Sequence, residues 1–204
     1  LGFFYQKTGK ANLAVNLYST MIENGEAHFG VYSNLGLSYL DLGYTDLAAV
    51  QFKNSLKLNQ NLPKGWLNLG MIDLKKGKID QSIACFNKAL SLDPNDYEVI
   101  NNLGNAFARK RDYKKSLSYY HNALTLKPNN VPVMSNYLSQ LNYTEHLELK
   151  DIFKEHLKYG KCFSKDKENF KLSSHQKKIT NNRIKIGFVS PDFQNHSVSN
   201  FILP

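Results

Sequence analysis

The sequence has few of the residues on which several classes of protein depend. Two cysteines, Cys85 and Cys162, among 204 residues are too few for a disulfide framework, and they lack the spacing of metal ligands. No run of about eighteen apolar residues is present, so we expect no membrane-spanning segment. Neither end resembles a signal peptide. With 42% hydrophobic and 21% charged residues, the chain is neither wholly disordered nor collagen-like. We therefore expect a globular protein of the cytoplasm without a metal site.

Arginine is also scarce, although the chain is basic. Lys and Arg number 26 against 17 Asp and Glu, which gives a net charge of +9, but only Arg109, Arg111 and Arg183 are arginines. The basic residues are spread along the chain, and aromatic residues are not interleaved with the arginines. Because a nucleic-acid-binding surface usually concentrates its basic residues in a patch or stripe, we expect no nucleic-acid partner.

An internal repeat dominates the first two thirds of the chain. The segments 29–62, 63–96 and 97–130 are copies of equal length that align without a gap, and residues 1–28 match the end of a further copy. The recurring positions are Leu35-Gly36, Leu69-Gly70 and Leu103-Gly104, then Ala48, Ser82 and Ser116, then Phe52, Phe86 and Tyr120, and last Ser55, Ala89 and Ala123. Because the chain begins with Leu1 inside a repeat, rather than with Met, we expect it to be a piece of a longer protein.

This pattern resembles the tetratricopeptide repeat (TPR), in which each copy is a pair of helices. The helices are predicted over residues 29–42 and 46–58, 63–76 and 80–92, and 97–110 and 114–126. One copy cannot bury its apolar face alone, so the copies are expected to stack into an α-solenoid with a concave surface. Three residues depart from the repeat: Gln60 replaces proline, Asp73 replaces an aromatic residue and Arg111 replaces glycine.

Core packing explains most of the repeated residues. The glycine of each Leu-Gly pair is predicted to lie where paired helices cross closely, and a larger residue there would cost about 1–3 kcal/mol through overpacking. The aromatic rings, such as Phe86 and Tyr120, are predicted core residues. Cys85 is predicted to be a small buried residue rather than a nucleophile.

One repeated position is not explained by core packing. Asparagine recurs at the same place in successive copies, as Asn34, Asn68, Asn102 and Asn136. Because the first helices of successive repeats lie side by side, we expect these carboxamides to form a row along the inner surface. A carboxamide both donates and accepts hydrogen bonds, which suits it to bind the backbone of an extended peptide. The alternative is that each asparagine bonds a neighbouring helix and only orients the repeats. Repeats that clamp a terminal carboxylate combine such asparagines with lysine or arginine, and no basic row is evident here.

After residue 130 the repeat ends. Residues 131–160 are predicted to form two capping helices, the first over 131–142 and the second from Thr144 to about Tyr159, with Gly160 as its stop. Residues 161–182 are polar and rich in lysine, which is typical of a linker or surface loop.

The character of the sequence changes again at residue 183. Residues 183–189, RIKIGFV, alternate and then become apolar, which predicts a strand that enters a buried sheet. A turn and a helix that begins near Ser197 follow, so residues 183–204 are predicted to open an α/β domain. Ligands of such sheets bind at the carboxyl ends of the strands, where we expect His196 to lie.

The segment 183–204 resembles the first strand and loop of the catalytic region of the O-linked N-acetylglucosamine transferase family. The shared elements are GFVS at 187–190, Asp192-Phe193 and HSV at 196–198. The order of parts, in which repeats and helices precede this segment, is also that of the family. Asn200 departs from the histidine or aromatic residue often found at its position, so its role is open.

The resemblance implies a mainly α protein whose TPR solenoid precedes a two-domain, Rossmann-like glycosyltransferase region. Members transfer N-acetylglucosamine from UDP-N-acetylglucosamine to Ser or Thr of polypeptides, use no metal, and hold the acceptor partly through an asparagine row. By its place in the motif, His196 matches the family's active-site histidine. Imidazole suits such a role because it can take a proton near neutral pH. The alternative role of His196 is to cap a helix or to bond the backbone. Because the donor half lies downstream of Pro204 in such enzymes, we expect this chain to be inactive alone.

The rival interpretation is a non-catalytic TPR adaptor, with residues 161–204 as an unrelated tail. Proteins or peptides are the expected partners under both interpretations, as acceptors in one and as ligands in the other. Association of the repeats into a homo-oligomer stays open. No cofactor is expected, because UDP-N-acetylglucosamine would be a substrate of the complete enzyme.

Overall fold

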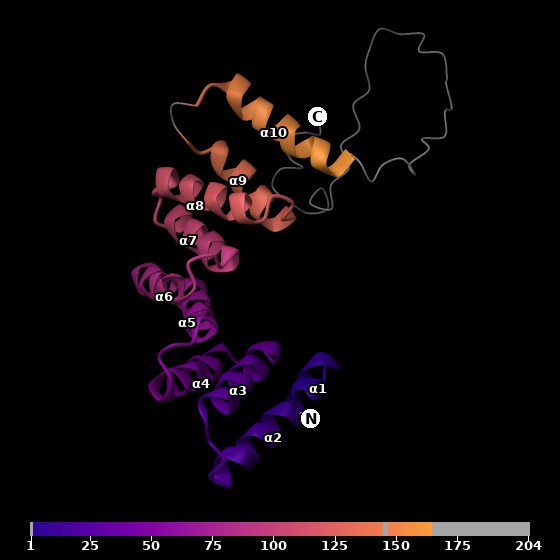
Figure 1. Ribbon diagram of the computed structural model, residues 1–204, viewed down its shortest axis with the longest axis vertical. Coiled ribbons are helices and arrows are strands. Elements are labelled where there is room, and N and C mark those ends of the chain that lie inside the picture. The colour runs from indigo at the N-terminus through magenta and orange to yellow at the C-terminus, as the bar shows by residue number, and fades with distance from the viewer. Residues whose placement is uncertain (1, 145–146, 165–204) are drawn as a thin grey trace, which may run out of the picture. The chain divides into compact units, whose positions relative to one another are not determined.

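The computed structural model describes residues 2–144 and 147–164, and these residues are helical with no strand among them (Figure 1). The helices are α1 (Gly2–Lys7), α2 (Ala11–Glu23), α3 (Phe29–Asp41), α4 (Thr45–Leu58), α5 (Pro63–Lys75), α6 (Ile79–Leu92), α7 (Tyr97–Arg109), α8 (Tyr113–Leu126), α9 (Val131–Leu141) and α10 (Leu149–Ser164). The predicted strand over 183–189, the start of the α/β region and His196 lie outside the described residues.

The helices pair within each copy of the repeat, and the pairs follow one another along the chain (Figure 1). In the three complete copies α3 packs against α4, α5 against α6, and α7 against α8, and the second helix of each pair packs against the first helix of the next. First helices of neighbouring copies also touch, α5 with α7 and α7 with α9. The six predicted repeat helices are confirmed, and each of their ends lies within one residue of its predicted place.

Each helix pair closes around one aromatic ring. Phe52 and Phe86 are fully buried, and Tyr120 is 3% exposed. The glycine of the first helix faces this ring: a Cβ atom added to Gly70 would lie 2.6 Å from Cε1 of Phe86, and one added to Gly104 would lie 2.6 Å from Cδ1 of Tyr120. These distances are too short for a real Cβ atom, so the predicted close crossing of the paired helices is confirmed.

Cys85 lies in the same core and not at a reactive site. It is 9% exposed, on the face of α6 that approaches Gly70. Burial raises the pKa of its thiol to about 11, with a smaller contribution from the negative charge of Asp73. A thiol that keeps its proton at neutral pH is a poor nucleophile, which agrees with the prediction of a structural role.

The turn between the helices of each copy requires a left-handed backbone. The same register position holds Gly9, Gly43, Gly77 and Arg111, whose φ angles are +72°, +81°, +76° and +63°. Glycine adopts this conformation at no steric cost, whereas the Cβ atom of other residues clashes with the backbone there. Arg111 therefore holds a strained conformation that the three glycines avoid.

We expect the substitution Arg111→Gly to stabilise the protein. Relief of the left-handed strain outweighs the greater entropy of glycine in the unfolded chain, for a net gain of about 0.5–1 kcal/mol in the free energy of unfolding. Urea denaturation followed by circular dichroism measures this change. The reverse exchange in the preceding copy, Gly77→Arg, serves as the control and should lower the free energy. A loss of stability in Arg111→Gly would contradict the explanation.

The chain after the third copy departs from the prediction at both ends of its second helix, which begins at Leu149 rather than at Thr144. α10 runs from Leu149 through Gly160 to Ser164, so the predicted stop at Gly160 is wrong. A Cβ atom on Gly160 would meet nothing within 4 Å, and its φ angle is not left-handed. An exposed glycine inside a helix costs only about 1 kcal/mol, which the packing of α10 offsets through Tyr159, 7% exposed and joined to Tyr137 of α9 at 5.8 Å between ring centroids. The first residues of the predicted linker, 161–164, therefore belong to α10.

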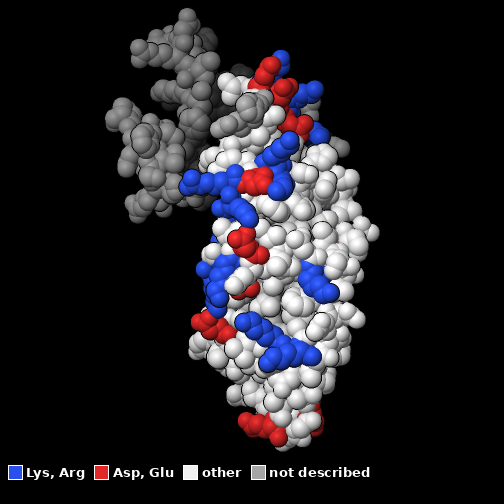
Figure 2. Space-filling view, turned by 90° about the vertical axis from the view of Figure 1, so that its left-hand side faces the viewer, with Lys and Arg blue, Asp and Glu red and all other residues white. Residues whose placement is uncertain are grey.

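Ion pairs join neighbouring copies at one repeated register position. Lys76 pairs with Asp46, and Lys110 Nζ lies 2.6 Å from Asp80 Oδ1, each pair linking a copy to the one before it. Both pairs are largely exposed, so each contributes little stability. Figure 2 shows basic and acidic side chains interspersed over one face of the molecule, with wide uncharged areas between them. On that face the positive excess is not gathered into a single patch.

Candidate functional site

A hollow of about 460 Å³ opens where the first helices of successive copies meet. α5 contributes Met71 and Lys75, α7 contributes Asn102, Asn105 and Arg109, and α9 contributes Asn136. The hydroxyl-bearing ring of Tyr120 from α8 reaches the same hollow. Two of the four predicted asparagines, Asn102 and Asn136, thus lie in one site. Asn34 on α3 and Asn68 on α5 occupy the same register position of earlier copies, outside this hollow.

The lining follows three rows of the repeat. The asparagine row holds Asn34, Asn68, Asn102 and Asn136, the second row holds Leu37, Met71 and Asn105, and the third row holds Asp41, Lys75 and Arg109. Within a helix these positions are three and four residues apart, so they share one helical face. Each row recurs once per copy, which places the equivalent residues on successive first helices.

Hydrogen bonds connect the asparagines of the hollow to one another. Asn136 Nδ2 donates to Asn101 Oδ1 (3.2 Å) and Asn105 Oδ1 (3.3 Å), which joins α9 to α7. Asn105 Nδ2 donates to Asn102 Oδ1 at 3.5 Å. Burial raises the pKa of the Tyr120 hydroxyl, which keeps its proton and donates to Asn105 Oδ1 at 2.8 Å. These bonds set the side chains in place before any ligand arrives.

Asn136 of the asparagine row has the orienting role considered from the sequence, and the peptide-binding role of the row stays a prediction. The bonds of Asn136 across to α7 orient neighbouring helices, as the alternative interpretation holds. Yet a carboxamide offers two N–H donors and two acceptor positions, and the bonds above leave capacity on each residue. All four asparagines are half-buried, so they are also within reach of a ligand. Asn68 has no side-chain hydrogen bond within the described part of the chain, whereas Asn34 bonds the hydroxyl of Tyr18.

Two cations share the hollow with the asparagines. Arg109 Nη1 donates to the backbone oxygen of Leu74 at 2.7 Å, and this bond anchors the guanidinium beside α5. Lys75 is exposed. Neither side chain has an acidic partner within residues 2–144 and 147–164. The sequence interpretation that no basic row accompanies the asparagines is thus incomplete: Lys75 and Arg109 stand at equivalent positions of successive copies, and that equivalence was the signal.

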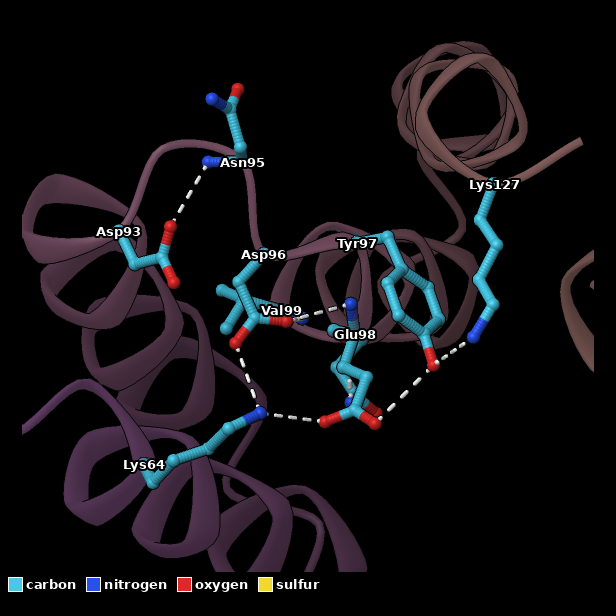
Figure 3. A network of polar contacts seen from close by, with 9 residues as sticks. Lys64, Asp93, Asn95, Asp96, Tyr97, Glu98, Val99 and Lys127 are labelled. Atoms are coloured by element: carbon cyan, nitrogen blue, oxygen red, sulfur yellow. Dashed lines mark hydrogen bonds and ion pairs between the residues drawn. The ribbon is translucent and has the colours of Figure 1, made fainter.

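A polar network joins the beginning of α5 to the beginning of α7 (Figure 3). Asp96, whose side chain is 7% exposed, caps α7 by accepting from the backbone N–H of Glu98 (2.9 Å) and Val99 (3.3 Å). From α5, Lys64 Nζ donates to Asp96 Oδ2 at 3.1 Å and to Glu98 Oε2 at 2.8 Å. Both helices also line the hollow, but the Lys64 side chain is 64% exposed, so the ion pairs add little to the stability of that arrangement.

The described residues of the hollow offer hydrogen-bonding carboxamides and two cations. Within residues 2–144 and 147–164, no group of three or more His, Cys, Asp or Glu is placed to hold a metal ion. None of the helices in that part of the chain combines the length and the apolar character needed to cross a bilayer. The predicted catalytic residue, His196, lies outside the described residues.

Family models match the repeated region. Two models described as tetratricopeptide repeat match residues 29–62 and 97–130, and a third, described as TPR repeat, matches residues 70–111. The first two matches coincide with copies that the sequence period delimits, and the third runs from the copy at 63–96 into the copy at 97–130. A comparison with curated proteins gives no match.

Several solved structures have a similar fold. MamA from Desulfovibrio magneticus is 15% identical, with 82% of this chain and 93% of that chain covered and a TM-score of 0.72. YrrB, described as a TPR protein with an unusual peptide-binding site, is 20% identical, with 66% and 69% covered and a TM-score of 0.61. The first TPR domain of Spaghetti, bound to a peptide of HSP90, is 18% identical, with 56% and 90% covered and a TM-score of 0.54. At these identities the likeness establishes the fold.

Proposed function

We propose that this chain, whose segments 29–62 and 70–130 are tetratricopeptide repeats, is a binding module that holds an extended segment of another protein. The observation that carries the proposal is the convergence of Asn102, Asn105 and Asn136 on one hollow. An extended peptide brings unpaired backbone N–H and C=O groups, which need hydrogen-bond partners when they leave water. Carboxamides supply both kinds of partner.

The geometry favours a binding site whose side chains are already in place before the peptide binds. The hydrogen bonds among the three asparagines and Tyr120 fix their side chains, so less side-chain freedom is lost when a ligand binds. The exposed Met71, at 47%, adds apolar surface next to these polar groups. Pockets that join apolar surface to a few placed polar groups are typical of ligand sites. The peptide-binding descriptions of YrrB and of the Spaghetti domain support the same function for this fold.

We expect the single substitutions Asn102→Ala and Asn136→Ala to weaken binding of a peptide selected by the wild-type chain. Each removes at least one hydrogen bond to the peptide, worth about 0.5–1.5 kcal/mol, so affinity should fall by roughly two- to tenfold. Fluorescence anisotropy with the labelled peptide measures the affinity. Asn87→Ala, the same change at an exposed position of α6, is the matched control.

Two comparisons separate a loss of peptide contacts from a loss of folding. Thermal unfolding of each variant must show that the chain is folded at the temperature of the binding assay, because Asn136 also joins α9 to α7. If Asn102→Ala and Asn87→Ala bind the peptide with equal affinity, the asparagines of the hollow do not contact the ligand and the proposed site is wrong.

A second proposal concerns the complete protein. The resemblance of residues 187–198 to the O-linked N-acetylglucosamine transferase family favours a transferase in which the repeats hold the acceptor and His196 belongs to the active site. UDP-N-acetylglucosamine would then be the donor. The coding frame beyond Pro204 tests this proposal: a continuing α/β sequence supports the transferase, and a stop codon there supports the adaptor.

A further inference from the structure

The three rows of the hollow differ in how they vary along the chain. The first row is asparagine in every copy, so it presents the same groups to each part of a bound segment. The second row changes from Leu37 and Met71 to Asn105, and the third from Asp41 to Lys75 and Arg109. A constant row suits contacts to the peptide backbone, which is the same at every residue. Selection between side chains must then come from the two variable rows.

Within the hollow, the third row is positive. Lys75 and Arg109 line it, and no Asp or Glu among the described residues does. The ion pairs of the described residues use six other lysines: Lys64, Lys76, Lys110, Lys115, Lys150 and Lys158. The charges of Lys75 and Arg109 are therefore not neutralised by the described part of the chain. A concave site lined by charge of one sign attracts ligands of the opposite sign.

Both cations also have the hydrogen-bonding capacity for a carboxylate. The bond from Arg109 to the oxygen of Leu74 uses one of the five N–H donors of the guanidinium, and the others remain. Lys75 has three donors on a flexible stem. Met71 lies four residues before Lys75, on the same face of α5, so an apolar contact is available beside the cation.

We infer that the hollow selects an extended segment that carries an acidic side chain beside a large apolar one. The carboxylate binds Lys75 and Arg109, the apolar side chain lies against Met71, and the asparagine row binds the backbone. This inference rests on the proposed function and adds the chemistry of the partner. It requires no free carboxyl terminus, because the carboxylate belongs to a side chain.

Selection from a display library tests the inference. The library presents random short segments joined to carrier protein at both ends, so no terminal carboxylate is available. The wild-type chain should enrich Asp and Glu together with large apolar residues. The variant Lys75→Glu/Arg109→Glu should lose the acidic enrichment and select basic segments. Lys88→Glu, the same charge change at an exposed position of α6, should select as the wild type does.

The double variant removes the bond from Arg109 to the backbone oxygen of Leu74 in α5, so it could fail to fold. A second measurement therefore tests the inference without changing Arg109. The exposed single variant Lys75→Glu and a selected synthetic peptide, acetylated and amidated, are compared by fluorescence anisotropy. Replacing Glu by Gln in the peptide should weaken wild-type binding about fivefold and should have less effect on Lys75→Glu.

The outcomes separate the inference from the proposed function. If the wild type enriches no segment at all, the proposed function fails. If it enriches segments without acidic residues, or if the folded double variant enriches the same acidic segments as the wild type, peptide binding stands and the inference is overturned. The same holds if replacing Glu by Gln in the peptide weakens binding to Lys75→Glu as much as binding to the wild type.

Discussion

Replacing Phe86 by alanine should lower the free energy of unfolding by about 3–5 kcal/mol. The ring is fully buried, in a cluster with Leu67, Leu74 and Leu103 that joins the second complete copy to the third. The substitution loses the transfer free energy of the ring and leaves a cavity that rigid helices cannot close. Small domains have only about 5–15 kcal/mol of stability in total, so the loss would be a large fraction of it.

The effect should extend beyond the site of the change. In a repeat array each copy is stabilised by its neighbours, so a cavity in a central copy also weakens the contacts on both sides. Urea denaturation followed by circular dichroism measures the free energy. Phe153→Ala on α10 is the matched control, because that ring is 63% exposed and its removal should change the free energy by less than about 0.5 kcal/mol. Equal losses in the two variants would show that Phe86 is not a core residue.

Replacing Gly70 by valine should lower the free energy of unfolding by about 1–3 kcal/mol. Gly70 lies on α5, opposite the ring of Phe86 on α6. The new Cβ atom would lie 2.6 Å from Cε1 of Phe86 and 3.1 Å from Cβ of Cys85. Neither neighbour is free to move: the ring is fully buried, and the Cβ of Cys85 is fixed to the backbone of α6. The helices must therefore separate, which loosens the packing around both residues.

The matched control for this substitution is Gly160→Val. Both glycines lie inside helices, but a Cβ atom on Gly160 meets nothing within 4 Å. Valine and glycine differ little in helix propensity compared with the cost of overpacking, so Gly160→Val should be near neutral. Thermal unfolding compares the two variants. If Gly70→Val melts at the same temperature as Gly160→Val, α5 and α6 do not cross as closely as described.

The repeat made most of the fold predictable because it records tertiary contacts as well as local structure. Gly70 and Phe86 recur together in the sequence, as a glycine and an aromatic ring at the same separation in every complete copy, which fixes which faces of the paired helices meet. The helix ends followed for the same reason. Where the repeat stops, the prediction is weaker: the last helix begins at Leu149 rather than Thr144, and it continues through Gly160 to Ser164. Glycine ends a helix when it adopts a left-handed φ angle, and Gly160 does not adopt one.

The candidate site was predictable only in part. The repeat interval identified the asparagines, but it treated all four as equivalent. Which of them share a hollow depends on contacts between copies, such as the bond from Asn136 to Asn101, which joins α9 to α7. The bond from Arg109 to the oxygen of Leu74 likewise crosses between copies. A period describes each copy, and it does not describe how the side chains of two copies meet.

The sequence by itself determined the period, the pairing of helices and the residues that face the core, because glycine, aromatic and apolar residues recur at intervals that only one packing satisfies. The tertiary structure alone decided that Asn102, Asn105 and Asn136 converge with Lys75 and Arg109 on one hollow. The physical reason is that core residues are selected by volume and burial, which spacing reveals. The polar residues of a site are brought together by the stacking of separate copies, and their hydrogen bonds and uncompensated charges exist only once those copies are in contact.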